Sequence, residues 1–316
     1  MSELSAMLST MSGKDIAQFF ATGNAEDIAR LVSTAADSEL RKLIEDDELR
    51  EAAVDAGLNR FQEFAVPERL AEVKGRVRFV VTRPRGADDR YDAEFGGGEV
   101  DVSPAGSGKP DVTISTGALD FVRLVSGTAS AALLLLSGRL RVEGDDALAL
   151  QIGGVFRVPG SDDIAVNPAA LDAVEVAAVV SESKDSYLRD VMKGGFRGVI
   201  LEEIFRRFPE YIDANRAKNM TLGVGFKIGG GPDDADRYLV SIDKGNCTVT
   251  KDGEGERKAT IALGGAEFLK LATGNLNPTM AFIRGALKVR GDISSALSLS
   301  AVMQIPSPKT QVGPKT

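Results

Sequence analysis

Apolar residues in the second half of the chain follow two different periods, and each period predicts a kind of element. Residues 198–211 carry Ile200, Ile204 and Phe208 at fourfold spacing, which predicts an amphipathic helix. Residues 220–228 carry an apolar side chain at every second position, which predicts a strand. The same reasoning predicts three more strands, at residues 237–242, 247–250 and 259–263. We expect these four strands to form a meander, because turns alone separate them.

The helical period returns after the fourth predicted strand. Residues 266–273 carry an apolar stripe at helical spacing, and Gly274 is expected to end that helix. Asn277 and Pro278 then predict the start of a short helix over residues 279–284, because asparagine is a favoured N-cap and proline fits the first helical position.

A fifth strand and a last helix complete the pattern. Residues 286–290 are predicted to form a strand, and Asp292 is expected to cap a helix over residues 293–305. Residues 173–192, which precede the first amphipathic helix, are also predicted to be helical. The order of the elements indicates an α+β fold, in which helices cover one face of a five-stranded, mostly antiparallel sheet.

The first half of the chain repeats this pattern, so the chain contains two copies of one domain. Adding 147 to a residue number aligns many identical residues, without a gap, from about residue 90 to residue 159. Both copies contain the skeleton G-x-L-x-V-x-G-D, which begins at Gly138 in the first and at Gly285 in the second. An offset of 148 also aligns Asp37 with Asp185, so the repeat extends into the helical segments before each sheet.

The repeat suggests where each domain begins and ends. We expect an N-terminal tail over residues 1–24, a first unit over residues 25–160 and a second unit over residues 161–316. A helical lead-in opens each unit, over residues 25–57 in the first and over residues 161–197 in the second.

Composition narrows the class of function. The chain has 43% apolar and 27% charged residues, so each half can bury a core of its own. The formal net charge of −8 disfavours nucleic acid as a partner, because the neutralisation of phosphates needs clustered lysine and arginine. The longest apolar run, residues 131–136, is too short to span a bilayer, and the first residues do not resemble a signal peptide. We therefore expect a cytoplasmic protein without stable membrane insertion.

The residue types that the chain lacks exclude several chemistries. There is no histidine, which excludes Ser-His-Asp and Cys-His nucleophile systems and histidine-ligated zinc or haem. Cys247 is the single cysteine, so neither an intrachain disulfide nor a thiolate-rich metal site can form. We expect no cofactor, no metal site and no catalytic residue, although carboxylates, lysine, tyrosine or serine could still catalyse a reaction.

A resemblance to a known family rests on residues 271–299, which read LATGNLNPTMAFIRGALKVRGDISSALSL. This stretch resembles the hallmark region of the sterol carrier protein 2 (SCP-2) family, and the resemblance covers nearly all of the second unit and residues 58–160 of the first. It implies a lipid-binding fold, with an apolar tunnel between sheet and helices that takes a sterol, a fatty acid or a fatty acyl-CoA. It also implies a non-enzymatic carrier that binds such a lipid and transfers it within the cell.

The candidate lipid-binding residues are apolar side chains on the short helices and the fifth strand of each unit. Methionine and phenylalanine suit an adaptable apolar cavity, although each of these side chains could equally pack in an ordinary core. In the second unit the candidates are Phe268, Leu271, Met280, Phe282, Ile283, Leu287, Val289, Leu297 and Met303. In the first unit they are Phe121, Leu124, Leu133, Leu135, Leu136, Leu140 and Val142.

The two copies differ at the start of the short helix. The first copy has Ser130 and no proline where the second has Asn277 and Pro278, so we expect a less sharply capped helix there. The leucines at residues 133–136 could also plug a tunnel. If one half alone carries lipid, the sequence favours the second half.

Other functions stay open at this point. One alternative is a structural or interaction module with collapsed pockets, which docks to enzymes of lipid metabolism. Another is an enzyme that uses carboxylates or tyrosine, but no such constellation stands out. The cations of the fifth strands could meet an acyl-CoA phosphate or a carboxylate, although an exposed strand face explains them more simply; they are Arg139, Arg141, Lys288 and Arg290.

Overall fold

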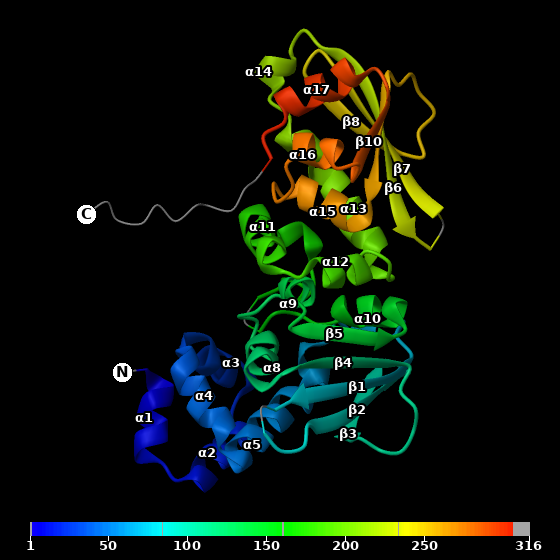
Figure 1. Cartoon of the computed structure of the whole chain (residues 1–316). Coiled ribbons are helices and arrows are strands. Elements are labelled where there is room, and N and C mark those ends of the chain that lie inside the picture. Colours follow the sequence, from blue (N-terminus) through cyan, green and yellow to red (C-terminus); the bar gives the residue numbers. More distant parts are fainter. Residues whose placement is uncertain (1, 84, 160, 233, 306–316) are drawn as a thin grey trace, which may run out of the picture. The chain divides into compact units, whose positions relative to one another are not determined.

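The computed structural model describes residues 2–83, 85–159, 161–232 and 234–305. The chain folds into two compact units, residues 1–167 and residues 168–316 (Figure 1). Each unit contains a lead-in of helices, a five-stranded sheet and further helices around the fifth strand. The predicted α+β fold, with two copies of the same domain, is therefore confirmed.

The first unit opens with seven helices. They are α1 (Glu3–Thr10), α2 (Gly13–Thr22), α3 (Ala25–Thr34), α4 (Asp37–Glu45), α5 (Asp47–Leu58), α6 (Phe61–Phe64) and α7 (Pro67–Leu70). The segment before residue 25, which we separated above as a tail, thus contains two helices. Its Leu4, Ile16 and Phe20 are buried in one core with Leu31 and Leu40 of the next helices. These N-terminal residues therefore pack as part of the helical layer of the first unit.

The sheet of the first unit has the strand order β3-β2-β1-β4-β5. Its strands are β1 (Gly75–Thr82), β2 (Asp89–Gly96), β3 (Glu99–Pro104), β4 (Val112–Gly117) and β5 (Leu140–Gly144). Strands β1 and β4 pair in parallel, and the other neighbours are antiparallel. Helices α8 (Ala118–Val125) and α9 (Ala131–Ser137) connect β4 to β5, and α10 (Asp146–Gly153) follows.

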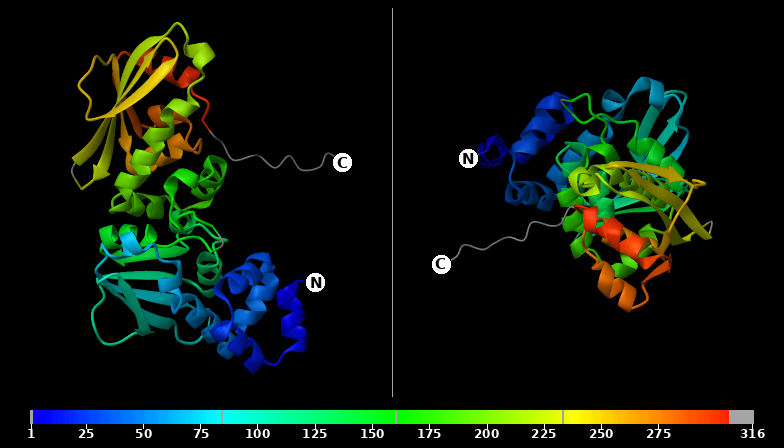
Figure 2. Two further views of the ribbon diagram at one scale, coloured as in Figure 1. Left: turned by 180° about the vertical axis from the view of Figure 1, so that it is seen from behind. Right: turned by 90° about the horizontal axis from the view of Figure 1, so that it is seen from above.

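The second unit repeats this order. Its lead-in consists of η1 (Pro168–Ala170), α11 (Ala173–Glu182), α12 (Asp185–Val191), α13 (Phe196–Arg207), η2 (Phe208–Tyr211) and α14 (Ala214–Ala217). Its strands are β6 (Thr221–Gly231), β7 (Asp234–Asp243), β8 (Asn246–Lys251), β9 (Ala259–Gly264) and β10 (Leu287–Gly291). Helices α15 (Gly265–Ala272), α16 (Pro278–Ile283) and α17 (Ile293–Val302) lie on one side of this sheet (Figures 1 and 2).

The predicted meander is wrong for the fourth strand. The order of the second sheet is β10-β9-β6-β7-β8, so β9 pairs in parallel with β6 and not with β8. The side chains explain this placement. Alternate residues of β9 are buried (Ala259, Ile261 and Leu263), which suits an inner position between two neighbours, whereas no residue of β8 is fully buried and that strand lies at an edge.

Equivalent polar contacts mark the repeat in three dimensions. The Arg60 guanidinium donates to the backbone oxygens of Phe20 and, at 2.5 Å, Gly23, and the equivalent Arg207 donates to those of Leu171 at 2.7 Å and Ala169 at 2.8 Å. The ion pair of Arg123 with Asp37 recurs as Lys270 with Asp185. In both units, therefore, cationic side chains from the residues after the helical lead-in hold the helical segments in place through hydrogen bonds and an ion pair.

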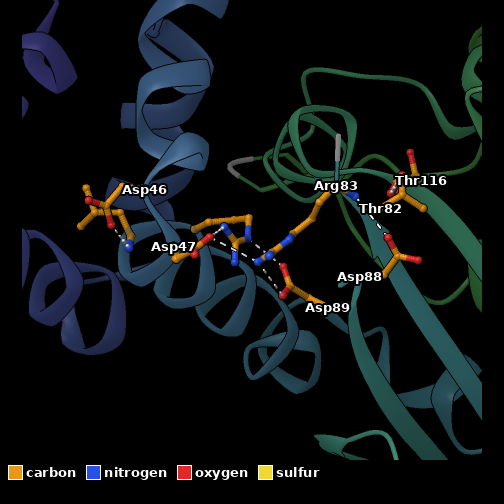
Figure 3. Close-up of polar contacts among 9 residues, drawn as sticks. Asp46, Asp47, Thr82, Arg83, Asp88, Asp89 and Thr116 are labelled. Atoms are coloured by element: carbon orange, nitrogen blue, oxygen red, sulfur yellow. Dashed lines mark hydrogen bonds and ion pairs between the residues drawn. The ribbon is translucent and has the colours of Figure 1, made fainter. Parts of the chain in front are cut away.

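A cluster of charged residues joins α5 to the strands of the first unit (Figure 3). The guanidinium of the buried Arg50 donates from Nε to Oδ2 of Asp89 at 2.8 Å and also contacts Asp47. Arg83 lies 3.3 Å from Asp47 and 3.7 Å from Asp89, so two arginines share two carboxylates. The second unit has glycine at the positions of Arg83 and Asp47. It therefore keeps only the pair equivalent to Arg50 and Asp89, which is Arg197 with Asp236.

Candidate functional site

The skeleton G-x-L-x-V-x-G-D performs the same structural task in both units. In the second unit Gly285 ends α16 with a φ of 74°, and Leu287 is buried on β10. Gly291 has a φ of 87°, and a Cβ atom there would lie 2.4 Å from the backbone oxygen of Lys258. The counterparts behave alike: Gly138 has a φ of 75°, Leu140 is buried, and a Cβ atom on Gly144 would lie 2.3 Å from the oxygen of Asp111.

The aspartate of the skeleton caps the helix that follows. The Asp292 carboxylate accepts from the backbone nitrogens of Ser294 and Ser295 at 3.0 and 3.2 Å, and from both hydroxyls. These hydrogen bonds, led by that of the Ser295 hydroxyl, lower the pKa of Asp292 to about 2. The predicted N-cap of α17 is therefore confirmed, and the skeleton fixes the strand between two short helices.

The short helix α16 begins as predicted. The Asn277 side chain accepts from the backbone nitrogen of Met280 at 2.9 Å, and Pro278 occupies the first helical position. In the first unit Ser130 caps α9 by accepting from the nitrogen of Leu133 at 3.4 Å. The longer bond agrees with the expected weaker cap in the first unit.

Helices α16 and α17 expose a group of large apolar side chains. Five of the six large hydrophobic residues that are exposed in the described part of the chain lie on these two helices, with exposed fractions from 43% to 69%. The five are Met280, Phe282, Ile283, Ile293 and Leu297. We call them the α16–α17 face. Both helices pack against β10, so the face lies beside the edge strand of the second sheet.

The second unit has a packed aromatic core, to which α13, η2, α15 and strands β6 and β7 contribute. The Phe205 ring stacks on Tyr238 and Phe268, with ring centroids 3.8 and 5.0 Å apart, and Phe208 and Phe226 adjoin it. Burial raises the pKa of Tyr238 to about 12, and its buried hydroxyl has no hydrogen-bond partner among the residues that the structure describes. In the first unit, burial and then the nearby Asp55 carboxylate raise the pKa of the equivalent Tyr91. Phe268 is thus a core residue.

The predicted lipid-binding residues fall into three groups. Buried ones are Phe121, Leu136, Leu140, Phe268 and Leu287. Half-buried ones are Leu124, Leu133, Leu135, Val142, Leu271, Val289 and Met303. Exposed ones are Met280, Phe282, Ile283 and Leu297, which lie on α16 and α17. The prediction omitted Ile293, although its fourfold spacing from Leu297 along a serine-rich helix could have indicated it.

The described residues of the first unit form no equivalent of this face. Leu136 occupies the position of Ile283, and its exposed fraction is 6% where that of Ile283 is 69%. Asp146 replaces Ile293, and Leu150, at the position of Leu297, is half-buried. The duplicated helices therefore present different surfaces in the two units.

A hollow of about 360 Å³ lies elsewhere, beside strand β7. Its lining is polar and contains none of the predicted lipid-binding residues; it consists of Arg237, Tyr238, Asp252, Gly253, Glu254, Gly255 and Arg257. The equivalent loop of the first unit is held by Arg78, which donates to Asp92 at 2.7 Å and to the backbone oxygens of Gly106 and Gly108 at 2.9 Å. The second unit has Gly225 and Leu239 at the positions of Arg78 and Asp92, so no equivalent arginine holds its loop.

Two further observations concern catalysis and membranes. Burial raises the pKa of the Cys247 thiol to about 11, which makes it a poor nucleophile at neutral pH. Across the residues that the structure describes, no group of three or more acidic or cysteine side chains is placed to hold a metal ion. No helix among these residues has both the length and the apolar character that a membrane crossing needs.

Comparison with known proteins agrees with the fold. Residues 57–157 and 201–304 match the model of the SCP-2 sterol transfer family. "Sterol carrier protein 2" of Arabidopsis thaliana is 34% identical over 101 residues, which are 30% of this chain and 82% of that protein. "Hydroxysteroid dehydrogenase-like protein 2" of Xenopus tropicalis is 28% identical over 105 residues, or 33% of this chain. A crystal structure of sterol carrier protein 2 like 2 from Aedes aegypti is 20% identical, covers 34% of this chain and 94% of that chain, and has a TM-score of 0.28.

The lengths of these relatives differ. The match spans most of the Arabidopsis protein, but 24% of the Xenopus protein and 15% of the rat "Sterol carrier protein 2", which is 30% identical over 82 residues. The two regions that match the family model together make up more than half of the chain, and each contains one of the two sheets. The chain therefore belongs to the SCP-2 sterol transfer family, with one family region in each unit.

Proposed function

We propose that the second unit binds one apolar lipid, which is a sterol, a fatty acid or a fatty acyl-CoA, and transfers it without chemical change. The α16–α17 face is the observation that carries this proposal. Exposed apolar surface of this size marks a site for an apolar partner, because burying it releases about 25 cal/mol per Å². Membership of the SCP-2 family supports a lipid as that partner.

The helices that carry the face are suited to admit a ligand. Helix α16 has six residues, and the left-handed Gly285 separates it from β10. So short a helix has few internal hydrogen bonds and depends on its cap and on packing. We propose that α16 and α17 move apart to let the lipid reach the half-buried side chains of Leu271, Val289 and Met303.

Lipid uptake by the delipidated full chain tests the proposal. We expect saturable binding of a fluorescent fatty acid, displaced by unlabelled fatty acid or sterol. The double variant I283Q/L297Q should bind at least tenfold more weakly, while M11Q, which changes an exposed methionine of the first unit, should bind normally. The absence of saturable uptake, or equal binding by all three proteins, would overturn the proposal.

For the first unit we propose a structural or interaction role. The burial of Leu136, and the aspartate at the position of Ile293, support closed helices there. Native mass spectrometry of the lipid-saturated chain separates the alternatives. One lipid per chain is expected, and two lipids per chain would show that both units are carriers.

A further inference from the structure

The loop between β8 and β9 covers part of the sheet face that points away from the helices. Phe226 packs against Phe205 of α13, so Gly225, its neighbour along β6, points to the opposite face, together with its cross-strand partner Leu239. Leu239 is nevertheless buried, because the loop lies over it: a Cβ atom on Gly255 would lie 2.6 Å from the Cδ2 atom of Leu239. The polar hollow described above is lined by this loop and by two residues of β7.

In the first unit a carboxylate occupies the corresponding place. Asp92, at the position of Leu239, accepts from two nitrogens of Arg78 at 2.7 and 2.8 Å and from the backbone nitrogen of Gly106 at 3.1 Å. The hydrogen bond from Arg78 lowers the pKa of Asp92, so this carboxylate is charged at neutral pH. Arginine and loop backbone thus hold an internal carboxylate between the sheet and the loop.

The second unit has lost this carboxylate and has gained an arginine in the loop. Leu239 occupies the position of Asp92, and the loop has Arg257 where the first unit has proline. The Cδ atom of Arg257 lies 3.2 Å from the position that a Cβ atom on Gly225 would take, which is the position of Arg78 in the first unit. Among the residues that the structure describes, no carboxylate forms an ion pair with Arg257. An arginine is therefore kept over this part of the sheet, without the carboxylate.

The lining of the hollow also contains two carboxylates. Asp252 and Glu254 replace alanine and serine of the first unit, and both side chains are exposed. Within the described ranges neither of them forms an ion pair with Arg237 or Arg257, and Arg237 has a long contact of 3.9 Å with Asp234. The hollow thus offers two cations and two carboxylates that do not neutralise one another directly.

The size and charge of the hollow fit a small zwitterion better than a simple anion. Its volume of about 360 Å³ is within the range of small-molecule sites, about 300–1,000 Å³. A guanidinium group binds a carboxylate through paired, charge-assisted hydrogen bonds, as Arg78 does in the first unit. Asp252 and Glu254 repel a ligand that carries a carboxylate alone, and they attract a ligand that also carries an ammonium group.

We propose that this hollow binds a small zwitterion that carries a carboxylate and an ammonium group, such as an amino acid. The ligand carboxylate takes the place of the Asp92 carboxylate and accepts from Arg237 and Arg257, while Asp252 and Glu254 contact the ammonium group. No lining residue of the hollow belongs to the α16–α17 face, so the proposal is independent of the proposed lipid binding.

Isothermal titration calorimetry of the full chain with matched small molecules tests the proposal. The zwitterions are glycine, β-alanine and γ-aminobutyrate, which differ in the distance between their charges, and the single-charge controls are acetate and methylamine. At least one zwitterion should bind saturably, and at least tenfold more tightly than either control. Saturable binding of none of the zwitterions, or equally tight binding of acetate, would overturn the proposal.

Variants locate the binding in the hollow. R257Q should lower the affinity for the zwitterion at least tenfold, whereas R90Q, which changes the first-unit equivalent of Arg237, should leave it unchanged. D252N/E254Q should lower the affinity for the zwitterion and not that for acetate. All of these side chains are exposed, and equal unfolding midpoints show that the variants fold. Equal affinities of R257Q and R90Q, or an unchanged preference of D252N/E254Q for the zwitterion, would overturn the proposal.

Discussion

Arg197 donates a hydrogen bond from Nε to Oδ2 of Asp236 at 2.7 Å, and the pair repeats that of Arg50 and Asp89 exactly one repeat length earlier in the chain. Arg197 is 3% exposed, and its other nitrogens donate to the backbone oxygens of Met192 at 2.8 Å and Ile228 at 2.6 Å. One guanidinium thus joins the helical lead-in to β6 and β7.

Replacing Arg197 should destabilise the second unit strongly. The variant R197A leaves the carboxylate and two backbone oxygens without their donor, and the loss of one partner of a buried pair costs about 3–5 kcal/mol. R206A, which removes a half-exposed partner of Glu203, should cost at most about 1 kcal/mol. Urea unfolding of the full chain measures the loss of stability in each variant. An equal loss for R197A and R206A would show that Arg197 does not stabilise the second unit through its buried contacts.

The two equivalent tyrosines should respond in opposite ways to the loss of their hydroxyls. Y238F removes a buried hydroxyl without a partner, so the free energy of unfolding should stay the same or rise. Y91F removes a hydroxyl that interacts with the Asp55 carboxylate and should lower the free energy of unfolding by about 1 kcal/mol. Thermal and urea unfolding compare the variants. A loss for Y238F as large as that for Y91F would show that the Tyr238 hydroxyl does have a partner.

The two glycines around β10 should differ in their tolerance of alanine. G285A places a Cβ atom in open space and should cost about 1–2 kcal/mol for the left-handed backbone alone. G291A adds a clash with the backbone oxygen of Lys258 and should cost clearly more. G144A, its counterpart, should behave like G291A. The unfolding midpoints of the three variants provide the measurement, and equal costs for G285A and G291A would contradict the stated clash.

Acid should loosen α17 through its cap. The pKa of Asp292 is lowered to about 2, so its contribution to stability is complete above about pH 4 and is lost as the pH falls through 2. D292N keeps a capping side chain that does not titrate. The difference in the free energy of unfolding between the unmodified chain and D292N should therefore shrink between pH 4 and pH 2. A difference that is constant over this range would contradict the role of the carboxylate.

Much of the fold could be predicted because local signals and burial agree. Asn277 with Pro278, Asp292 and the glycines of the skeleton each act on their own neighbours, and the structure places them as expected. Local signals of this kind could not predict that β9 pairs with β6. Alternation shows that a strand has a buried face, but not which strand lies beside it. The 3-10 turn at Pro209, within a predicted helix, reflects the missing proline N–H.

The site was harder to predict because apolar spacing does not separate core from surface. Phe268 and Ile283 fit the same helical pattern, yet one stacks on Phe205 and the other is exposed. Burial depends on what packs from distant segments, such as α13 over the sheet. The sequence does show that the two copies differ at the start of the short helix, where the second has Asn277. That the apolar side chains of this helix are exposed could be seen only in the structure.

The parallel pairing of β6 with β9 has a consequence for the order of folding. Strands β6, β7 and β8 are neighbours along the chain, so they can pair early. The pairing of Val224 on β6 with Ala259 on β9 forms later, because it closes a long loop that contains β7 and β8. During synthesis, a chain that ends before β9 therefore has an unpaired edge on β6, at the centre of the future sheet. Such an edge can pair with another nascent chain, so we expect the second unit to be most prone to aggregation before β9 has been synthesised.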